Sequence, residues 1–388
     1  MTADIRFAVL DARVPREREQ WIRLWEESPS QLPFAHPAVA ETMVSTEDRL
    51  LCATTRSGEG TAIYPVILRR VDAEANDLIS PYGYGGALHW NCANPTALAY
   101  RFWADFDLWA HENRVISEFV RASLFDDILP HPGWTRDRAV NYVRTLTADV
   151  DVLGTSAPKV RQNVRKALRS GLSVRIDREG RLGEAFHRIY TATMDRRNSA
   201  ERYRFSSDFF ARLQAGFGDR AVYFAAEAEG VPVSMDLVLL GRDTGYYFLG
   251  GTDPEGLSLR ANDLVKATVM EWLQDNGCRS YVLGGGVVPG DGLERYKKGF
   301  APEGRCSFRT IERVFDSQAY TDRVESRRSR ARSQGCDWPA DEDFFPLYRS
   351  PLPPPQSAAD VPAPQTGAEA PAERSGDIAP DPQLIAAP

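Results

Sequence analysis

A row of arginines is the first feature of the sequence that suggests chemistry. Arg161, Arg165 and Arg169 lie at i, i+4 and i+8, so on a helix they share one face, with Lys159 and Lys166 beside them. Like charges at this spacing destabilise a helix by roughly 0.2–0.5 kcal/mol per pair. Two interpretations stay open: the row binds carboxylates or phosphates, or it is an ordinary solvated face.

A second basic group lies further along the chain. Arg196 and Arg197 are adjacent, and the segment 202–205 (RYRF) alternates arginine with aromatic residues. Arginine supplies positive charge and aromatic rings supply stacking surfaces, so this segment also suits an anionic or ring-bearing ligand.

Glycines mark two places where the backbone can approach a ligand closely. Tyr82 and Tyr84 alternate with glycines in the segment 80–86 (SPYGYGG), and 284–286 is a run of three glycines. Glycine permits a close approach because it lacks a β-carbon, but it equally marks bulges and turns. No P-loop and no strand followed by G-x-G-x-x-G is present, so we expect neither of these nucleotide-binding motifs.

The last candidate segment is 292–300 (GLERYKKGF), which contains Tyr296, Lys297 and Lys298. On its residues alone we predict a basic, aromatic loop of low specificity.

The elements that position these segments occur in the same order twice. The expected elements are strands at 50–55 and 62–68, a helix at 97–112 and a strand at 115–119, then strands at 221–226, 231–240 and 245–249, a helix at 259–274 and a strand at 280–283. The pair Gly85–Gly86 recurs as Gly250–Gly251, and Trp109 recurs as Trp272 at nearly the same spacing. An asparagine-containing turn and a strand follow each tryptophan, which indicates an internal duplication.

We therefore predict an α+β (mixed α/β) fold with a cleft near the junction of two halves. The predicted segments are a first module at 1–150, a second module at 151–320 that carries the main motifs, a basic helical extension at 321–350 and a disordered Pro/Ala-rich tail at 351–388.

Composition excludes several classes of protein. The net charge of −7 does not indicate a nucleic-acid binder without a local basic face, and no apolar run approaches the roughly 18–20 residues that span a bilayer. The five cysteines and five histidines are scattered, so we expect neither a disulfide framework nor a metal site. The N-terminal residues do not resemble a signal peptide, and we expect a cytoplasmic protein.

Several motifs together resemble one known family. Val160–Val174 (VRQNVRKALRSGLSV) resembles the helix, turn and strand that open the second module of Fem-type (FemABX-like) aminoacyltransferases and the related BioF2-like acetyltransferase domains. Tyr190–Asn198 resembles the next helix end. The segment 246–253 (YYFLGGTD) and the final aromatic-Lys-x-Gly-Phe sequence of 292–300 resemble the end of that module. The resemblance covers about 80–320 and is weaker in the first half, where 80–86 is also similar.

The resemblance implies tandem acetyltransferase-like modules (the GNAT, or acyl-CoA N-acyltransferase-like, fold) and an acyltransferase that forms amide bonds. An acceptor amine attacks an activated acyl carbon in such enzymes. By this resemblance, Lys297 would stabilise the acyl carbonyl or the tetrahedral intermediate, and Tyr296, Lys298 and the backbone of Phe300 would shape the site.

The resemblance also implies binding roles. Arg161, Arg165 and Lys166 would hold phosphates of the acceptor or donor, and Arg196 and Arg197 are secondary candidates for the same role.

Cleft-lining positions are implied as well. Gly250 and Gly251 would border the substrate, and Tyr82 and Tyr84 would line the cleft, although a core or turn role suits the two tyrosines equally.

The donor is the open question at this stage. Acetyl-CoA users of this fold carry a Q/R-x-x-G-x-G/A loop before the central helix, where backbone amides bind the pyrophosphate. The corresponding stretch, Leu257–Asp263 (LSLRAND), lacks those glycines. We therefore expect aminoacyl-tRNA as the donor, no tightly bound cofactor, and a cell-wall precursor or other small-molecule amine as the acceptor. The alternatives are an acyl-CoA-dependent N-acyltransferase and a non-catalytic binding module.

Overall fold

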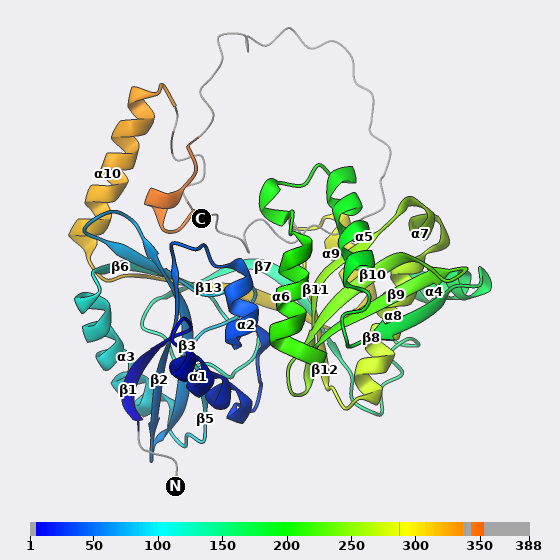
Figure 1. Ribbon diagram of the computed structural model, residues 1–388, viewed down its shortest axis with the longest axis horizontal. Helices are drawn as coiled ribbons and strands as arrows, with labels where there is room; N and C mark the ends of the chain where they lie inside the picture. Colours follow the sequence, from blue (N-terminus) through cyan, green and yellow to red (C-terminus); the bar gives the residue numbers. More distant parts are fainter. Residues whose placement is uncertain (1–4, 287, 337, 339–342, 353–388) are drawn as a thin grey trace.

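The strands of the protein form one continuous sheet. The computed structural model describes residues 5–286, 288–336, 338 and 343–352. Across this part of the chain the strand order is β1-β2-β3-β4-β6-β13-β7-β12-β11-β10-β9-β8, with β5 paired to β3. Figure 1 shows the two halves of the chain side by side, with helix α10 rising from the first half.

The strands are β1 (Ile5–Asp11), β2 (Arg49–Ser57), β3 (Gly60–Arg70), β4 (Asn76–Ile79), β5 (Leu88–Trp90), β6 (Val115–Arg121), β7 (Trp134–Thr145), β8 (Ser173–Asp177), β9 (Ala221–Ala228), β10 (Val231–Leu240), β11 (Thr244–Thr252), β12 (Ser280–Gly285) and β13 (Arg305–Val314). The α-helices are α1 (Pro15–Glu27), α2 (Pro37–Ala40), α3 (Pro95–Glu112), α4 (Pro158–Arg169), α5 (Gly183–Arg196), α6 (Ser207–Phe217), α7 (Pro254–Leu259), α8 (Ala261–Asp275), α9 (Gly292–Phe300) and α10 (Ser317–Ser333).

The order of elements confirms the predicted duplication. In the first half, β2, β3 and β4 pair antiparallel, α3 follows, and β6 then pairs parallel to β4. In the second half, β9, β10 and β11 pair antiparallel, α8 follows, and β12 pairs parallel to β11. The mixed α/β fold and its tandem arrangement are as predicted.

The repeat extends to the way the two central helices end. Helix α3 is followed by Asn113 and helix α8 by Asn276, and each asparagine side-chain amide donates a 2.8 Å hydrogen bond to the carbonyl of Trp109 or Trp272. Each of these carbonyls also accepts the backbone N–H of the same asparagine at 3.0 Å, so asparagine ends both helices with the same pair of hydrogen bonds.

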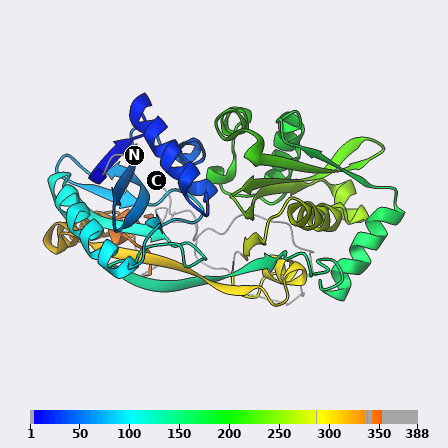
Figure 2. The same ribbon diagram turned by 90° about the horizontal axis from the view of Figure 1, so that it is seen from below.

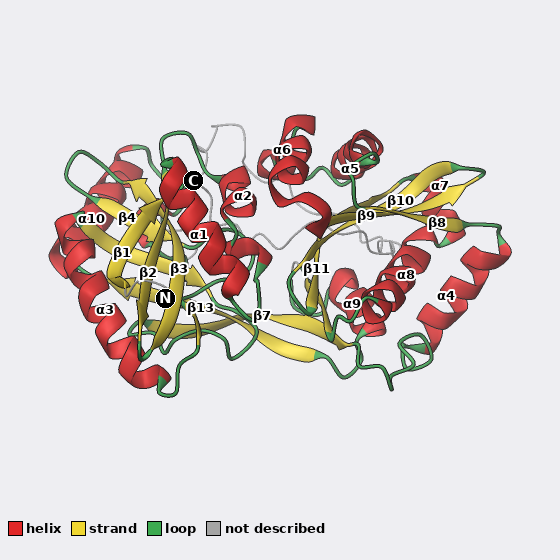
Figure 3. Cartoon of the chain, turned by 60° about the horizontal axis from the view of Figure 1, so that its bottom comes forward, coloured by secondary structure: helices red, strands yellow, loops and turns green. Residues whose placement is uncertain are grey.

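The halves exchange their last strands. Strand β7, from the first half of the sequence, pairs with β12 of the second half, and β13, from the end of the second half, pairs with β6 of the first. The two exchanged strands also pair with each other. Figures 2 and 3 show β7 and β13 running between the two halves. The predicted modules 1–150 and 151–320 therefore describe chain order, while the sheet joins the two.

Helices cover both faces of the sheet. In the second half, α5 and α6 lie on one face and α4, α8 and α9 on the other (Figure 3). Strand β9 shows the reason, because Tyr223 and Ala225 belong to the core beneath α5 and α6, whereas Val222 and Phe224 belong to the core beneath α8. The first of these cores continues into the first half, so one apolar cluster joins both halves.

Two sequence expectations need correction. The segment 292–300 is helix α9 rather than a loop, because the Asp291 side chain caps it by accepting a hydrogen bond from the Glu294 amide. The helix expected over 259–274 begins at Ala261, because Arg260 has a φ of 64° and separates α7 from α8. Most of α10 lies within the basic extension predicted at 321–350, and the helix itself begins at Ser317, where Asp316 caps it. Most of the predicted tail, 353–388, lies outside the described residues.

No helix among the described residues combines the length and the apolar character that crossing a bilayer requires.

Candidate active site

A small cavity lies where parallel strands β11 and β12 separate. The two strands pair only over Thr244–Tyr246 and Ser280–Val282, and the residues that follow on each strand diverge to line the cavity. The carboxyl ends of parallel strands are the usual location of ligand sites in open α/β sheets. Both halves contribute to the lining, which is Phe34, Tyr82, Gly83, Tyr84, Tyr190, Tyr247, Phe248, Leu249, Gly250, Leu283, Gly284, Gly285 and Lys297.

Lys297 brings a positive charge into this cavity. Its side chain extends from α9, only 6% of the residue is exposed, and its Nζ donates a 2.6 Å hydrogen bond to the Gly285 carbonyl. The same Nζ lies 5.6 Å from the centroid of the Tyr247 ring. An ammonium carries three donors, so the bond to Gly285 fixes its position and is compatible with donation to a ligand.

Gly284 keeps the space in front of Lys297 open. Its φ of 78° favours glycine, and a β-carbon at this position would lie 3.1 Å from Lys297 Nζ. The same point is 3.7 Å from Asn141 Oδ1 and 3.9 Å from the Tyr84 hydroxyl. An ammonium, an amide and a phenol therefore converge on one small volume.

Asn141 is the member of this group whose side chain lacks a hydrogen-bond partner in the described part of the chain. It lies on the exchanged strand β7, paired with Gly285 of β12, and only 1% of it is exposed. Neither its side-chain oxygen nor its side-chain nitrogen has a hydrogen-bond partner among the described residues. Buried amides are normally satisfied, so this one is suited to bind a ligand.

A buried ion pair lies behind the cavity. Lys266 of α8 contacts Asp236 of β10 at 2.7 Å, and its Nζ sits 3.4 Å from the centroid of the Tyr247 ring. Burial raises the pKa of Asp236 and lowers the pKa of Lys266, and each charge opposes the shift of the other. Tyr247 is thus held between two lysines, Lys266 behind it and Lys297 in the cavity.

Tyr296 does not line the cavity, although it is adjacent to Lys297 in sequence. Its ring packs at 5.0 Å from the ring of Phe300 and against the core beneath α4 and α8. Successive residues of a helix point about 100° apart, so α9 directs only one of the two side chains to the cavity. Burial raises the pKa of the Tyr296 hydroxyl well above its ordinary range.

Three other predicted binding residues do reach the cavity. Tyr82 and Tyr84 line it from the first half, and Gly250 lines it from β11. Gly251 faces helix α5 instead, because a β-carbon there would lie 3.0 Å from the Ile189 carbonyl oxygen. Glycine at this position therefore allows α5 to pack closely against β11.

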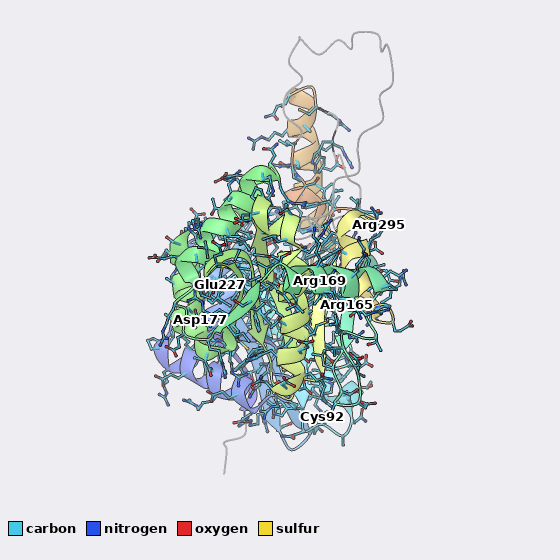
Figure 4. The ribbon with its side chains drawn as sticks, turned by 90° about the vertical axis from the view of Figure 1, so that its right-hand side faces the viewer. Cys92, Arg165, Arg169, Asp177, Glu227 and Arg295 are labelled. Carbon is cyan, nitrogen blue, oxygen red and sulfur yellow. The ribbon has the colours of Figure 1, made fainter. Side chains whose placement is uncertain are left out.

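The structure does not bring the arginine row to the cavity. Arg161 donates to the carbonyls of Gly154 and Ser156, in the loop before α4. Arg165 and Arg169 are exposed on the outer helix α4, on the surface that Figure 4 faces. Lys166 donates a 2.9 Å bond to the Ser258 carbonyl, and Lys298 is exposed on α9.

Arg196 and Arg197 lie at the end of α5, the helix that supplies Tyr190 to the cavity. Arg196 donates a 2.7 Å bond to the Thr252 carbonyl at the end of β11. Arg197 is half-buried immediately after the helix. Both are near the elements that line the cavity, but neither is part of its lining.

The start of helix α8 is occupied by protein groups. Asp263 lies in its first turn, 4% exposed, and the Asn163 amide of α4 donates a 3.1 Å bond to its carboxylate. Burial raises the pKa of Asp263 to about 6. Asn163 and Lys166 thus hold α4 against the start of α8 and the end of α7.

Sequence reasoning missed several residues of the site. Asn141, Asp236 and Lys266 carry no motif, and Phe34 comes from a segment with no recognised feature. Tyr247 is the only one with a signal, because it precedes the glycine pair that sequence comparison within the chain had marked.

Comparison with known proteins identifies the second half. Residues 158–298, which include Lys297, match the family described as acetyltransferase (GNAT) domain. No curated protein matches the chain.

Solved structures resemble the chain over both halves. FemX shares 12% identity, with 78% of this chain and 97% of that chain covered and a TM-score of 0.60. The C-terminal domain of a putative lysylphosphatidylglycerol synthetase from Agrobacterium fabrum shares 11% identity, with 78% and 94% covered and a TM-score of 0.51. A conserved protein of unknown function from Bacteroides thetaiotaomicron shares 11%, with 80% and 99% covered and a TM-score of 0.51. At these identities the likeness concerns the fold.

The second half is therefore a GNAT-type acyltransferase domain within a Fem-like fold, as the resemblance of its motifs implied.

Proposed function

We propose that this GNAT-type acyltransferase transfers an amino acid from an aminoacyl-tRNA to the amine of a cell-wall precursor or natural-product scaffold. The observation that carries the proposal is the convergence of Lys297, Asn141 and Tyr84 on the space above Gly284. A buried ammonium is the kind of donor that stabilises the oxyanion of acyl transfer, and the unsatisfied oxygen of Asn141 beside it can accept a hydrogen bond from a reacting amine.

The reaction needs little more than orientation and charge. The acceptor amine attacks the carbonyl carbon of the aminoacyl ester, a C–N bond forms, and negative charge develops on the carbonyl oxygen. Lys297 donates to that oxygen, and Asn141 Oδ1, which is an acceptor, can receive a hydrogen bond from the attacking amine. The C–O bond to the ribose then breaks, and the proton lost by the amine is taken up by the departing ribose oxygen.

The start of α8 supports an ester donor over acyl-CoA. An anion binds at a helix N-terminus because backbone N–H groups and the helix dipole attract it. Here the Asp263 carboxylate occupies the first turn of α8, and α4 covers it through Asn163. A pyrophosphate at this place would meet both a like charge and a packed helix.

The size of the cavity supports a small acyl group. Its volume of about 50 Å³ corresponds to about three to five water positions. Glycyl or alanyl groups match that volume better than large side chains do.

Radioactive transfer with the full chain tests this proposal. Transfer RNA charged with ¹⁴C-glycine or ¹⁴C-alanine is incubated with the protein and a panel of amine acceptors that includes lysine-containing cell-wall precursors. We expect transfer that ribonuclease abolishes. Transfer that survives ribonuclease and depends on an acyl-CoA would refute the proposed donor.

Two variants separate catalysis from folding. Lys297→Met should lower kcat by about 10²–10³, the usual effect of removing an oxyanion donor. Arg295→Gln removes an exposed positive charge from the same helix and should leave kcat unchanged. A Lys297→Met protein with normal turnover would contradict the role of Lys297. Ligand binding without transfer from either donor would favour a binding module.

A further inference from the structure

A second cavity adjoins the candidate active site on the side of the first half. It has a volume of about 370 Å³ and shares Tyr82 with the first cavity, so the two are neighbours. Its polar lining comes from Ser45, Asp48, Arg69, Ser80, Tyr82 and Arg121, and its other lining residues are apolar. None of the reaction steps above uses this cavity.

Arg69 presents an unsatisfied donor in this region. Only 4% of the residue is exposed, and its Nε donates a 2.9 Å bond to the Asp77 carboxylate. Its Nη2 is buried and has no hydrogen-bond partner among the described residues. A buried guanidinium nitrogen without a partner costs stability unless a ligand satisfies it.

A second buried guanidinium belongs to the same cavity. Arg121 is 3% exposed, and its Nη1 donates a 3.0 Å bond to the Ser80 carbonyl. Burial, together with the nearby charge of Arg69, lowers the pKa of Arg121 to about 10. Two positive charges that are close enough to affect each other in a buried place favour the binding of an anion.

The carboxylates nearby do not remove this excess of positive charge. Asp77, which Arg69 contacts, also accepts a 3.0 Å bond from the Tyr348 hydroxyl and is paired with Arg349. Asp48 lines the cavity as a second carboxylate, so two carboxylates face the three guanidiniums of Arg69, Arg121 and Arg349.

We infer that this cavity binds an oxyanion, a phosphate or a carboxylate, that belongs to the acceptor substrate. The acceptor would then be an amine with an anionic group: the oxyanion is held by Arg69 and Arg121, and the amine extends past Tyr82 to Lys297. The assignment to the acceptor rests on the proposed function, whereas the oxyanion site itself does not.

Titration calorimetry tests the site without any turnover. Inorganic phosphate and acetate are titrated separately into the full chain. The anion that binds with the higher affinity indicates whether the natural group is a phosphate or a carboxylate. Arg69→Gln and Arg121→Gln should each weaken binding by about tenfold or more. Arg70→Gln removes the same charge from the next, exposed position of β3 and should bind as the wild type does.

Folding of the variants is controlled independently. Arg69→Lys keeps the charge but loses the planar fork, and should bind with intermediate affinity. Urea unfolding of each variant shows whether it is folded. Binding of neither anion by the wild type, or equal binding by the folded Arg69→Gln, Arg69→Lys and wild-type proteins, would overturn the inference.

A kinetic measurement then tests the link to the acceptor. Arg69→Gln should raise KM for an anionic amine at least tenfold and leave KM for its uncharged analogue unchanged. Equal KM changes for both acceptors would overturn the link while leaving the oxyanion site intact. Loss of all transfer in the wild type with normal phosphate binding would refute the proposed function but not the site.

Discussion

Replacing Asp263 with asparagine should stabilise the protein, and more strongly at high pH than at low pH. Burial raises the pKa of this carboxyl from its usual 3.8 to about 6, against the opposing hydrogen bond from Asn163. Between these two values the unfolded chain ionises the carboxyl while the folded protein keeps it protonated. Stability therefore falls as the pH rises through this interval, and the full cost is present above pH 6.

The magnitude follows from the two pKa values. At about 1.36 kcal/mol per pKa unit, the cost is about 3 kcal/mol at pH 8 and about half of that at pH 5. Asparagine removes the charge but keeps an oxygen that can accept the hydrogen bond from Asn163. Urea unfolding of the wild type and Asp263→Asn, monitored by circular dichroism at pH 5 and pH 8, measures the gain in the free energy of unfolding at each pH.

A matched variant checks that the gain comes from burial. Asp208 also lies in the first turn of a helix, α6, but it is exposed and pairs with Arg212 at 2.9 Å. Asp208→Asn should change stability by less than about 1 kcal/mol, without a gain at pH 8. The reasoning fails if Asp263→Asn is no more stable than the wild type at pH 8, or if its gain is equal at both pH values.

Three further changes test the site and the fold. Gly284→Ala should destabilise the protein by about 1–3 kcal/mol in urea unfolding, because the φ of residue 284 is 78°. It should also reduce the turnover of acyl transfer, because the new methyl group contacts Lys297. Lys266→Met leaves Asp236 buried without its partner and should lower the free energy of unfolding by about 3–5 kcal/mol. The double variant Lys266→Met/Asp236→Asn should lose less stability, and a double-mutant cycle measures the difference. Asn113→Ala and Asn276→Ala should each cost about 1 kcal/mol in urea unfolding, because each removes the same hydrogen bond; a clearly unequal cost would count against equivalent helix ends.

The sequence predicts the duplicated part of the fold well, because the signals there are local. Trp109 and Trp272 mark matching helix ends, and the alternation of apolar residues marks the strands between them. The exchange of β7 and β13 is not predictable in this way. It depends on pairing between residues far apart in sequence, and neither strand has a motif that names its partner.

The candidate site divides along the same line. Lys297, Tyr82, Tyr84 and Gly250 are recognisable from motifs, and all four reach the cavity. Asn141 is not, because only the pairing of β7 with β12 places it beside Gly285. The basic row on α4 is recognisable from the sequence, but it does not reach the cavity. Arg161 donates to the loop before α4, Lys166 donates to the Ser258 carbonyl, and the other two arginines are exposed.

The exchanged strands also constrain how the chain can be made. Strand β6 is buried along its whole length and has β13 as its neighbour, so its edge stays open during synthesis until the chain has been completed through Val314. An open strand edge is a template for wrong pairing with another nascent chain. The first half therefore cannot finish folding on the ribosome before the second half has emerged, and the two halves should unfold as one cooperative unit. Truncation after residue 150 would yield an aggregating fragment rather than an independent domain.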